Sequence, residues 1–318
     1  MLAKRALVMV VLLPFAVSYS AEEPATEGPI PAGFHQVWSD EFTTLSLRTG
    51  GPSYDGLADG TGTWAAPGAW YSDDPRGVAG YGYDWFVDPS FDRWPAGYPR
   101  LGQFAITPEG LRIRAEAPSP AMARMLPMAV RDRKMHPWLA GQINSFHAVR
   151  IKPPFYFEAR AKMPAGVGRP FPAIWLVTGA HKHPGDHARD YEIDVQEGFG
   201  DSDRLHATIH WNTSPDTANF PSRDVVNMAA AGDLSAGFNT WGCYVTTKQQ
   251  VIYFNGKEVG RVVTPETAVA DQPFGIILDV SAGLPWKGGG PPSGGPHDMI
   301  VRYVRLYGPD GPGPVARP

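Results

Sequence analysis

Cysteine is almost absent from this chain, because Cys243 is the single cysteine among its 318 residues. Without a second cysteine the chain has no internal disulfide, so its stability must come from packing, with or without the help of a metal. Cys243 lies in an apolar segment, Trp241 to Thr246, that resembles a strand. We therefore expect a buried, unreactive thiol there rather than a nucleophile.

The chain also lacks an excess of charge of either sign. Its 28 Lys and Arg against 32 Asp and Glu give a formal net charge of −4, and no long run of like charges interrupts the sequence. A nucleic-acid partner is therefore not expected, because such proteins carry a concentrated basic surface. A pattern for a serine-hydrolase nucleophile elbow, G-x-S-x-G, is likewise missing.

Long hydrophobic runs are missing too. The apolar stretch Ala6 to Val17 spans 12 residues and contains Pro14, whereas a membrane-spanning helix needs about 20. Lys4 and Arg5 precede it and small serines follow it, which is the layout of a secretory signal peptide. We predict a signal peptide over residues 1–20 and a secreted or periplasmic protein with no membrane contact after its removal. A retained membrane anchor is the alternative, and the short apolar stretch disfavours it.

What the chain has in abundance is glycine, proline and aromatic residues. The 36 Gly and 33 Pro exclude a helical bundle, and the 37 Trp, Phe and Tyr need burial or a ligand. Residues 50–100 are dense in Gly, Pro and aromatic residues and show no sustained hydrophobic period. This composition predicts a long ordered loop region, which we expect to shape one edge of a ligand-binding cleft. We expect a leader over residues 21–33, one domain over residues 34–308, a short tail over residues 309–318, and a monomer.

Short runs with a period of two predict an all-β fold. In the segment Phe155 to Met163, apolar and polar residues alternate, as in a strand with one dry and one wet face. Asn255 and Gly256 separate two such runs and predict a β-hairpin, because both tolerate a positive φ. A series of short strands at this spacing is typical of an antiparallel sandwich or barrel. The predicted strands are residues 34–42, 111–115, 142–151, 155–163, 173–177, 191–197, 205–211, 241–246, 251–263 (the hairpin), 275–280 and 299–307.

Three acidic residues in one predicted strand carry the chemical signal. Glu192 and Asp194 share a face of the strand by alternation, whereas Glu197 has the opposite parity and would point into the apolar side. A buried unpaired carboxylate is costly, so we predict a β-bulge near Val195 and Gln196 that returns Glu197 to the face of the other two. A solvated acidic strand face or a calcium site is the alternative reading of the same residues.

Three converging carboxyl groups suit glycoside cleavage with retention of configuration. Like charges at short distance cannot all ionise freely, so at least one pKa must rise, which separates an acid from a nucleophile. The retaining mechanism needs two carboxyl groups about 5 to 5.5 Å apart. Side chains on one face of a strand, with Cα atoms about 6 to 7 Å apart, are able to converge to that separation.

The sequence resembles the family-16 glycoside hydrolases, the group of laminarinases, agarases and carrageenases, along most of its length. Seven segments carry the resemblance in order: residues 37–42 (VWSDEF), 140–145 (AGQINS), 157–164 (FEARAKMP), 172–175 (PAIW), 192–197 (EIDVQE), 206–211 (HATIHW) and 301–307 (VRYVRLY). The resemblance implies a two-sheet antiparallel β-jelly-roll sandwich of the concanavalin A-like kind. It also implies the form of the family's acidic motif that contains one extra residue before the last glutamate, here Glu197, and so forms a bulge.

The family pattern implies roles for the acids. Glu192 would be the nucleophile, Asp194 its electrostatic and proton-sharing assistant, and Glu197 the general acid and then base. His210 would be a cleft residue, and Trp138, Trp175 and Trp286 are candidate sugar platforms, since a pyranose stacks its apolar face on an indole. Each tryptophan has a core position as its alternative.

Two positions depart from the family pattern. Phe171 stands where the family usually has a tryptophan before its Pro-Ala, which reduces one sugar-stacking surface. Arg302 replaces an aspartate that helps to hold a structural calcium together with the glutamate of Asp-Glu-Phe, here Glu41. A cation at that position disfavours calcium, and we expect Arg302 to pair with Glu41 instead. No cofactor or metal is expected.

Five of the nine histidines fall within thirty residues: His181, His183, His187, His206 and His210. A catalytic zinc would need three such groups to converge. The first three lie in a predicted loop without a cysteine, so a zinc site is disfavoured, and His206 is equally well explained as a residue that bonds a neighbouring strand.

The sequence thus predicts a secreted, endo-acting retaining glycosidase that hydrolyses a β-linked polysaccharide by double displacement. The acidic chain lacks a basic cluster for sulfated galactans, so β-1,3-glucan, mixed-linkage glucan or a bacterial exopolysaccharide is the expected substrate. A carbohydrate-binding lectin on the same fold and a transglycosylase are the alternatives.

Overall fold

The computed structural model describes most of the predicted domain. The described residues are 28–48, 63–65, 77–79, 82–87, 102–125, 138–146, 148–178, 190–212, 221–268, 270–283, 291–309 and 315–316. The predicted signal peptide, Trp286, His181, His183 and His187 lie outside them, as do most of the leader, of residues 50–100 and of the tail.

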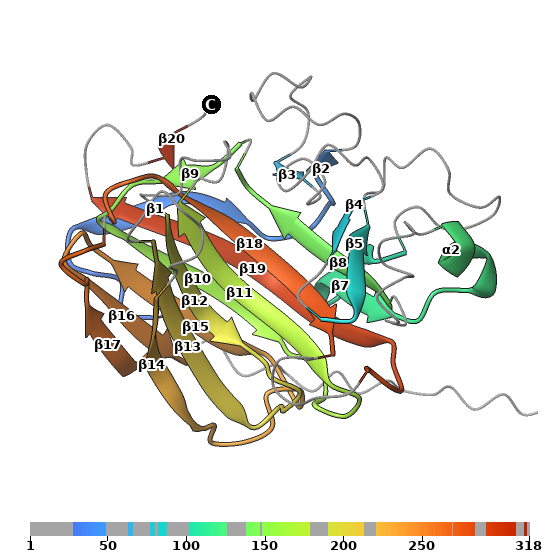
Figure 1. Cartoon of the computed structure of the whole chain (residues 1–318). Helices are drawn as coiled ribbons and strands as arrows, with labels where there is room; N and C mark the ends of the chain where they lie inside the picture. Colours follow the sequence, from blue (N-terminus) through green and yellow to red (C-terminus); the bar gives the residue numbers. More distant parts are fainter. Residues whose placement is uncertain are drawn as a thin grey trace, which may run out of the picture.

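Two mostly antiparallel β-sheets form the fold (Figure 1). In the first, sheet A, the strands β17, β16, β15, β10 and β19 lie side by side in this order. On its far side the long strand β19 pairs with both β1 and β7. Strand β7 pairs in turn with β6 and with β8, and β5 and β4 follow β8. Its strands are β1 (Phe34–Asp40), β4 (Gly77–Ala79), β5 (Asp84–Val87), β6 (Phe104–Thr107), β7 (Gly110–Glu116), β10 (Phe155–Lys162), β15 (Asn239–Val245), β16 (Gln249–Phe254), β17 (Lys257–Val263) and β19 (His297–Pro309).

The second sheet, sheet B, has the order β14–β13–β12–β11–β18, followed by β8, β3 and β2. Strand β8 (Trp138–Asn144) pairs with strands of both sheets. The other strands are β2 (Leu47–Arg48), β3 (Trp64–Ala65), β9 (Arg150–Ile151), β11 (Pro170–Thr178), β12 (Tyr191–Glu197), β13 (Arg204–Trp211), β14 (Ser222–Ala229), β18 (Phe274–Ala282) and β20 (Val315–Ala316), and a short helix, α2 (Pro120–Met125), follows β7.

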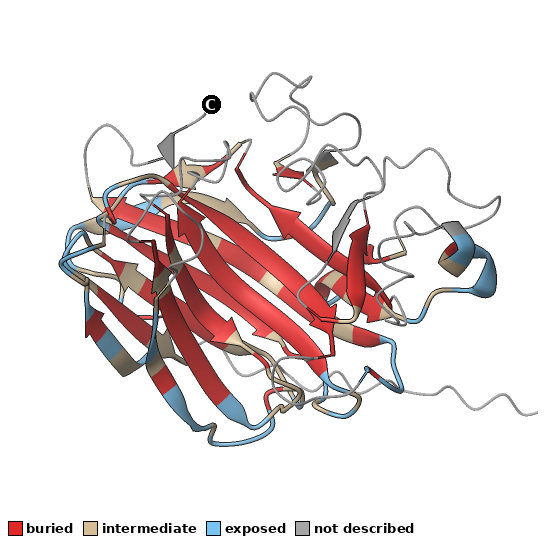
Figure 2. Ribbon diagram, in the orientation of Figure 1, coloured by how far each residue is buried: buried red, intermediate tan, exposed pale blue. Residues whose placement is uncertain are grey.

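The main hydrophobic core lies between the two sheets. It joins residues of sheet A such as Phe157 and Leu306 to residues of sheet B such as Ile193 and Val280, all fully buried. Figure 2 shows this burial running along the central strands of both sheets, with exposed residues at their ends and edges. Alternation along each strand sends one set of side chains into this core and the other set to the outer faces of the sheets.

The predicted two-sheet β-sandwich is therefore confirmed, as is the hairpin. Asn255 and Gly256 connect β16 to β17 with φ values of 47° and 75°. Cys243 is buried as predicted, and its burial raises the pKa of the thiol. Among the described residues, no helix has the length and apolar character needed to cross a membrane.

Strand β14 was missed by the sequence patterns, although it pairs with β13 along nearly its whole length. Only Val226 of its eight residues is buried, so the strand has almost no apolar alternation. Strands at the edge of a sheet need few buried side chains, and their periodicity is correspondingly weak.

The expected partner of Glu41 was also wrong. Arg305 forms the ion pair with Glu41, with Nε 3.0 Å from Oε1 and Nη2 3.2 Å from Oε2. Arg302 instead lies over the ring of Phe238, 5.0 Å from its centroid. Arg305 lies opposite Ser39 in the pairing of β1 with β19, whereas that pairing ends at Val304 and leaves Arg302 beyond the end of β1.

Candidate active site

Strand β12 contains the predicted bulge. Its pairing with β11 runs from Ala173 opposite Glu197 to Ile174 opposite Gln196, and then directly to Trp175 opposite Asp194. Val195 therefore has no partner on β11, and it is the extra residue that shifts the alternation. The prediction of a bulge near Val195 and Gln196 is confirmed.

The bulge brings the three acids to one face of sheet B. Glu192, Asp194 and Glu197 lie opposite Val177, Trp175 and Ala173, which form a small apolar cluster separate from the main core. In contrast, Ile193 and Val195 of the same strand belong to the main core. Opposed residues of neighbouring strands point to the same face, so the three carboxyl groups lie on the outer face.

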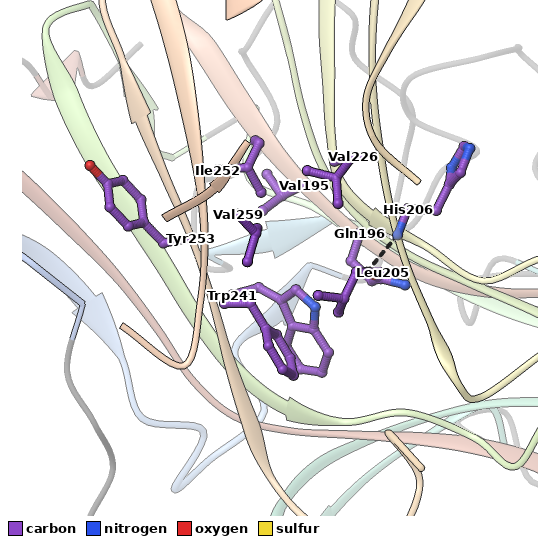
Figure 3. A pocket seen from close by; sticks show the side chains of 11 residues that line it. Val195, Gln196, Leu205, His206, Val226, Trp241, Ile252, Tyr253 and Val259 are labelled. Atoms are coloured by element: carbon purple, nitrogen blue, oxygen red, sulfur yellow. Dashed lines mark hydrogen bonds between the residues drawn. The ribbon is translucent and has the colours of Figure 1, made fainter. Parts of the chain in front are cut away.

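The inner side of the bulge fills a narrow space between the sheets. This space is lined by Val195 and Gln196 of β12 together with side chains of β13, β14, β15, β16 and β17. Figure 3 shows Val195 against Ile252 and Val226, and Gln196 beside Leu205. The apolar side chain of the extra residue is thus buried, which holds the bulge in place.

Two histidines of β13 lie beside the acids. His210 is opposite Glu192 in the pairing of β12 with β13, and its Nε2 is 3.2 Å from Oδ2 of Asp194. Nδ1 of His206 is 3.5 Å from Oε2 of Glu197. His210, which the resemblance implied to be a cleft residue, thus lies beside the carboxyl groups, and His206, for which strand bonding was the alternative, also faces an acid.

A cation would find ligands at this place. One ligand atom each from Glu192, Asp194 and His210 lies within 4.8 Å of the other two. Oxygen ligands with a single imidazole are compatible with several divalent ions. The prediction that the protein uses no metal stays a prediction.

Crowding and loss of water change the acidity of the carboxyl groups. Burial is the main cause that raises the pKa of Glu192 well above its usual range, the charge of Asp194 adds to it, and His210 acts in the opposite direction. Burial, followed by the charges of Glu197 and Asp279, likewise raises the pKa of Asp194. Burial and the neighbouring carboxyl groups therefore favour the protonated forms of Glu192 and Asp194 over those of free carboxyl groups.

Two further acids, Asp279 of sheet B and Asp84 of sheet A, lie near this row and were not predicted. Asp279 of β18 is fully buried, and its Oδ2 accepts a hydrogen bond of 2.8 Å from Nε1 of Trp175. Burial raises its pKa, and the charges of Asp84 and Glu197 contribute. Burial also raises the pKa of Asp84 to about 7. Asp279 is the one acidic residue in the apolar segment of β18, and this isolated acid is the feature of the sequence that could have indicated a role in the site.

The structure packs the predicted aromatic platforms tightly. Trp138 and Trp175 are about 5% exposed, and so is Phe171. Trp138 stacks on His297 with ring centroids 5.3 Å apart, and Phe171 stacks on Phe199 at 5.4 Å. This packing agrees with the core position that was the alternative for each tryptophan, and the role of these side chains as sugar platforms stays a prediction. Of the three, Trp175 lies directly opposite an acid, so it is the one brought to the site.

Comparison with known proteins gives two relatives by sequence. The endo-1,3-1,4-β-glycanase ExsH of Rhizobium meliloti is 27% identical over 281 residues, which cover 86% of this chain and 52% of the relative. A β-glucanase of Rhodothermus marinus is 27% identical over 166 residues, 48% of this chain and 56% of the relative. The chain therefore spans about half the length of the curated relatives that it matches. No family model matches the chain.

Solved structures share the fold. A non-specific endo-β-1,3(4)-glucanase of family 16 superposes with a TM-score of 0.61 at 21% identity, covering 89% of this chain and 94% of that one. The laminarinase of Rhodothermus marinus also gives 0.61, at 18% identity over 86% and 97% of the two chains. The laminarinase catalytic domain of Thermotoga maritima gives 0.59 at 20% identity, over 88% and 99%. The resemblance to family-16 glycoside hydrolases and the jelly-roll fold are confirmed.

Proposed function

We propose that this protein is an endo-acting glycoside hydrolase that cleaves a β-linked glucan with retention of configuration. The observation that carries the proposal is the bulge at Val195, which places Glu192, Asp194 and Glu197 on one face of sheet B. The similarity to a β-1,3-1,4-glycanase and a β-glucanase supports the same chemistry.

The proposed reaction has two steps. Glu197 donates a proton to the departing glycosidic oxygen while the carboxylate of Glu192 attacks the anomeric carbon and forms a glycosyl ester. Glu197 then removes a proton from water, which attacks the same carbon and releases Glu192. Two inversions at one carbon give net retention.

Asp194 is proposed to support the nucleophile in its protonated form, which burial favours. The charge of Asp194 is the second cause that raises the pKa of Glu192. A proton on Asp194 removes this charge and makes ionisation of Glu192 easier. His210, 3.2 Å from Asp194, also favours the ionised form of Glu192.

A neutral glucan fits the electrostatics of the site better than an anionic polysaccharide. The outer face of sheet B carries the three acids, with Asp279 and Asp84 beside them. An anionic group bound there would face several carboxyl groups that already resist ionisation. We therefore propose β-1,3- or mixed β-1,3-1,4-linked glucan as the substrate class, with a neutral bacterial exopolysaccharide as the alternative.

The decisive experiment incubates the purified protein with β-1,3-glucan, mixed-linkage glucan and an anionic exopolysaccharide. New reducing ends from the neutral glucans, whose anomeric proton signals show the β-form first, are the expected result. Binding without new reducing ends would establish a lectin, and products longer than the substrate would establish a transglycosylase. An α-product formed first would contradict the retaining mechanism.

We also propose that the protein acts outside the cytoplasm. The supporting pattern is the basic start, the 12-residue apolar stretch and the small residues at Ser18 and Ser20. N-terminal sequencing of the protein recovered from the culture medium or periplasm is expected to begin at Ala21. A protein that keeps its first 20 residues would contradict this proposal.

A further inference from the structure

The buried amide of Gln196 lies at the end of the ladder between β12 and β13. That ladder runs from Tyr191 opposite Trp211 to Asp194 opposite Thr208, before the bulge. On its other side β12 continues to pair with β11 as far as Glu197. The segment that carries Glu197 is thus held by backbone pairing on one side only.

Gln196 supplies the missing connection with its side chain. Its Nε2 donates to the backbone oxygen of Arg204 at 3.2 Å and to that of Glu197 at 2.9 Å. Its Oε1 accepts from the backbone N–H of His206 at 3.3 Å, the bond drawn in Figure 3. Both amide hydrogens and the amide oxygen are used, and the side chain is only 2% exposed.

These bonds also fix the backbone of His206 and Glu197, whose side chains lie against each other. His206 N–H and the Glu197 carbonyl are tied to one amide, and the His206 ring lies with Nδ1 3.5 Å from Oε2 of Glu197. On its other sides the ring faces Phe199, at 4.5 Å between centroids, and Asp224, with Nε2 3.8 Å from Oδ1. The ring is therefore held between β12, β14 and the segment after β12.

We propose that Gln196 is a positioning residue for Glu197. It ties the bulged segment to β13 and so holds the carboxyl group where it donates its proton to the leaving group. This inference rests on the proposed function. The alternative is that Gln196 only fills buried space, in which case its loss would lower stability without a selective effect on proton donation.

The test uses Gln196→Met, which keeps the length of the side chain but removes all three hydrogen bonds. The matched control is Gln250→Met. Gln250 is also fully buried, and its amide also makes three bonds, to the Thr246 oxygen, the Thr264 hydroxyl and the Tyr191 hydroxyl. It lies on β16 of sheet A and touches none of the acids by these bonds.

The measured quantity is kcat/KM for two aryl β-glucosides of the same oligosaccharide. One has a dinitrophenol leaving group, which departs without a proton, and the other has a phenol leaving group, which needs one. We expect Gln196→Met to lose about 30-fold on the phenyl substrate, since small displacements of a catalytic group cost up to about 100-fold. The loss on the dinitrophenyl substrate should be less than about threefold, because acid catalysis is not needed there.

Gln250→Met is expected to change kcat/KM by the same factor for both substrates. An equal loss on the two substrates with Gln196→Met, or no loss on either, would overturn the inference. If Gln196→Met does not fold, Gln196→Asn carries the same test, because it keeps an amide in the buried site but is one methylene too short to bridge the strands.

Glu197→Ala separates this inference from the proposed function. It should show the strongest selective loss on the phenyl substrate. If Glu197→Ala lacks that selectivity, the assignment of the acid fails. If Glu197→Ala shows it and folded Gln196→Met does not, only the role of Gln196 fails.

Discussion

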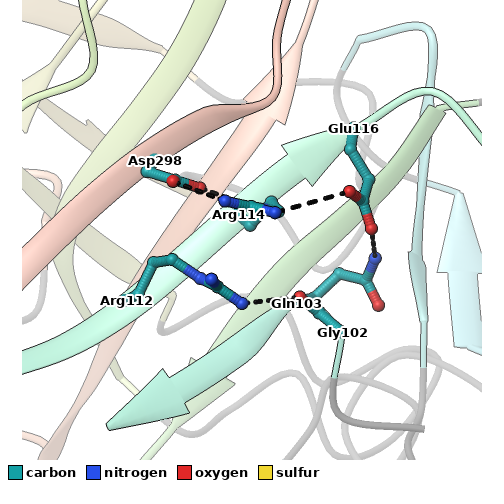
Figure 4. A network of polar contacts seen from close by, with 6 residues as sticks. All are labelled: Gly102, Gln103, Arg112, Arg114, Glu116 and Asp298. Carbon is teal, nitrogen blue, oxygen red and sulfur yellow. Dashed lines mark hydrogen bonds and ion pairs between the residues drawn. The ribbon is translucent and has the colours of Figure 1, made fainter. Parts of the chain in front are cut away.

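Asp298 and Glu158 of sheet A and the acids of sheet B have opposite surroundings. On sheet A, Asp298 receives two hydrogen bonds from Arg114 at 2.7 and 2.8 Å, and Glu116 lies 3.7 Å from the same guanidinium (Figure 4). The fully buried Glu158 accepts bonds from Gly28 N–H, Tyr156 and Tyr303. Asp298 and Glu158 of this sheet thus have donors that compensate for lost water.

On sheet B the acids have each other as neighbours. The charges that act on Glu192, Asp194 and Asp279 come mainly from further carboxyl groups, and burial raises the pKa of each. An arrangement of this kind costs stability and is retained where protons must be exchanged. Acids with compensating donors hold the sandwich together, whereas acids without them are available for chemistry.

Removal of an uncompensated acid should have the largest effect. Glu192→Gln and Glu197→Gln are each expected to lower kcat on β-glucan by at least roughly 10³-fold, because the nucleophile or the proton donor is lost. Their melting temperatures should stay equal to or rise above that of the wild type. Asp298→Asn on sheet A is the control, with activity expected within twofold. Substantial activity in either glutamine variant would remove the distinction between the sheets.

Asp84 is expected to make the stability of the fold depend on pH. Its pKa is raised from about 3.8 to about 7 in the folded protein, so folding favours the protonated form. The stability that this gives is present below pH 4 and is lost as the pH rises through 7, on the order of 4 kcal/mol. Denaturant unfolding at pH 4, 6 and 8 should show this decline in the wild type. Asp84→Asn should weaken it, and an unchanged decline would mean that Asp84 has a normal pKa.

A compensated acid should matter for stability and not for catalysis. Glu158→Gln places an amide nitrogen among three donors, and we expect it to cost about 2–3 kcal/mol of unfolding free energy. Equilibrium denaturation measures this loss, and kcat and KM under native conditions should stay within twofold. A large fall in kcat with unchanged stability would show that sheet A also takes part in the reaction.

The smallest effect is expected at the partly exposed pair of Arg305 and Glu41. Arg305→Met should lower the unfolding free energy by about 0.5–1 kcal/mol in low salt, and by less in 1 M salt, since ions screen exposed pairs. Thermal unfolding at the two salt concentrations measures the difference. A loss of several kcal/mol independent of salt would place this pair among the strongly buried ones.

Much of the fold was predictable because the strands have one buried and one outer face. The segments Tyr191–Glu197 and Phe155–Lys162 were predicted within one residue of their bounds. Strand β14 escaped prediction because burial of Val226 alone leaves no periodic signal. The aromatic platforms show a second limit, since composition cannot tell whether Trp138 meets a sugar or the ring of His297.

The three acids were predicted as one group. Regular alternation would have pointed Glu197 into the apolar interior, and a bulge was the way to avoid a buried charge there. Asp279, Asp84 and the bridging amide of Gln196 were not predicted as parts of the site. They reach it from strands β18 and β5 and from the inner side of the bulge, and such contacts between strands distant in the sequence have no local pattern.

The all-β class, the Asn255–Gly256 hairpin and the register change in β12 follow from the sequence alone, because alternation, turn chemistry and the cost of a buried carboxylate act over a few neighbouring residues. The choice of strands that flank β12, and with it the neighbours of each acid, is made by the folded structure. A carboxyl group gains or loses its proton according to the water and charges around it, and strand pairing across the sheet sets both.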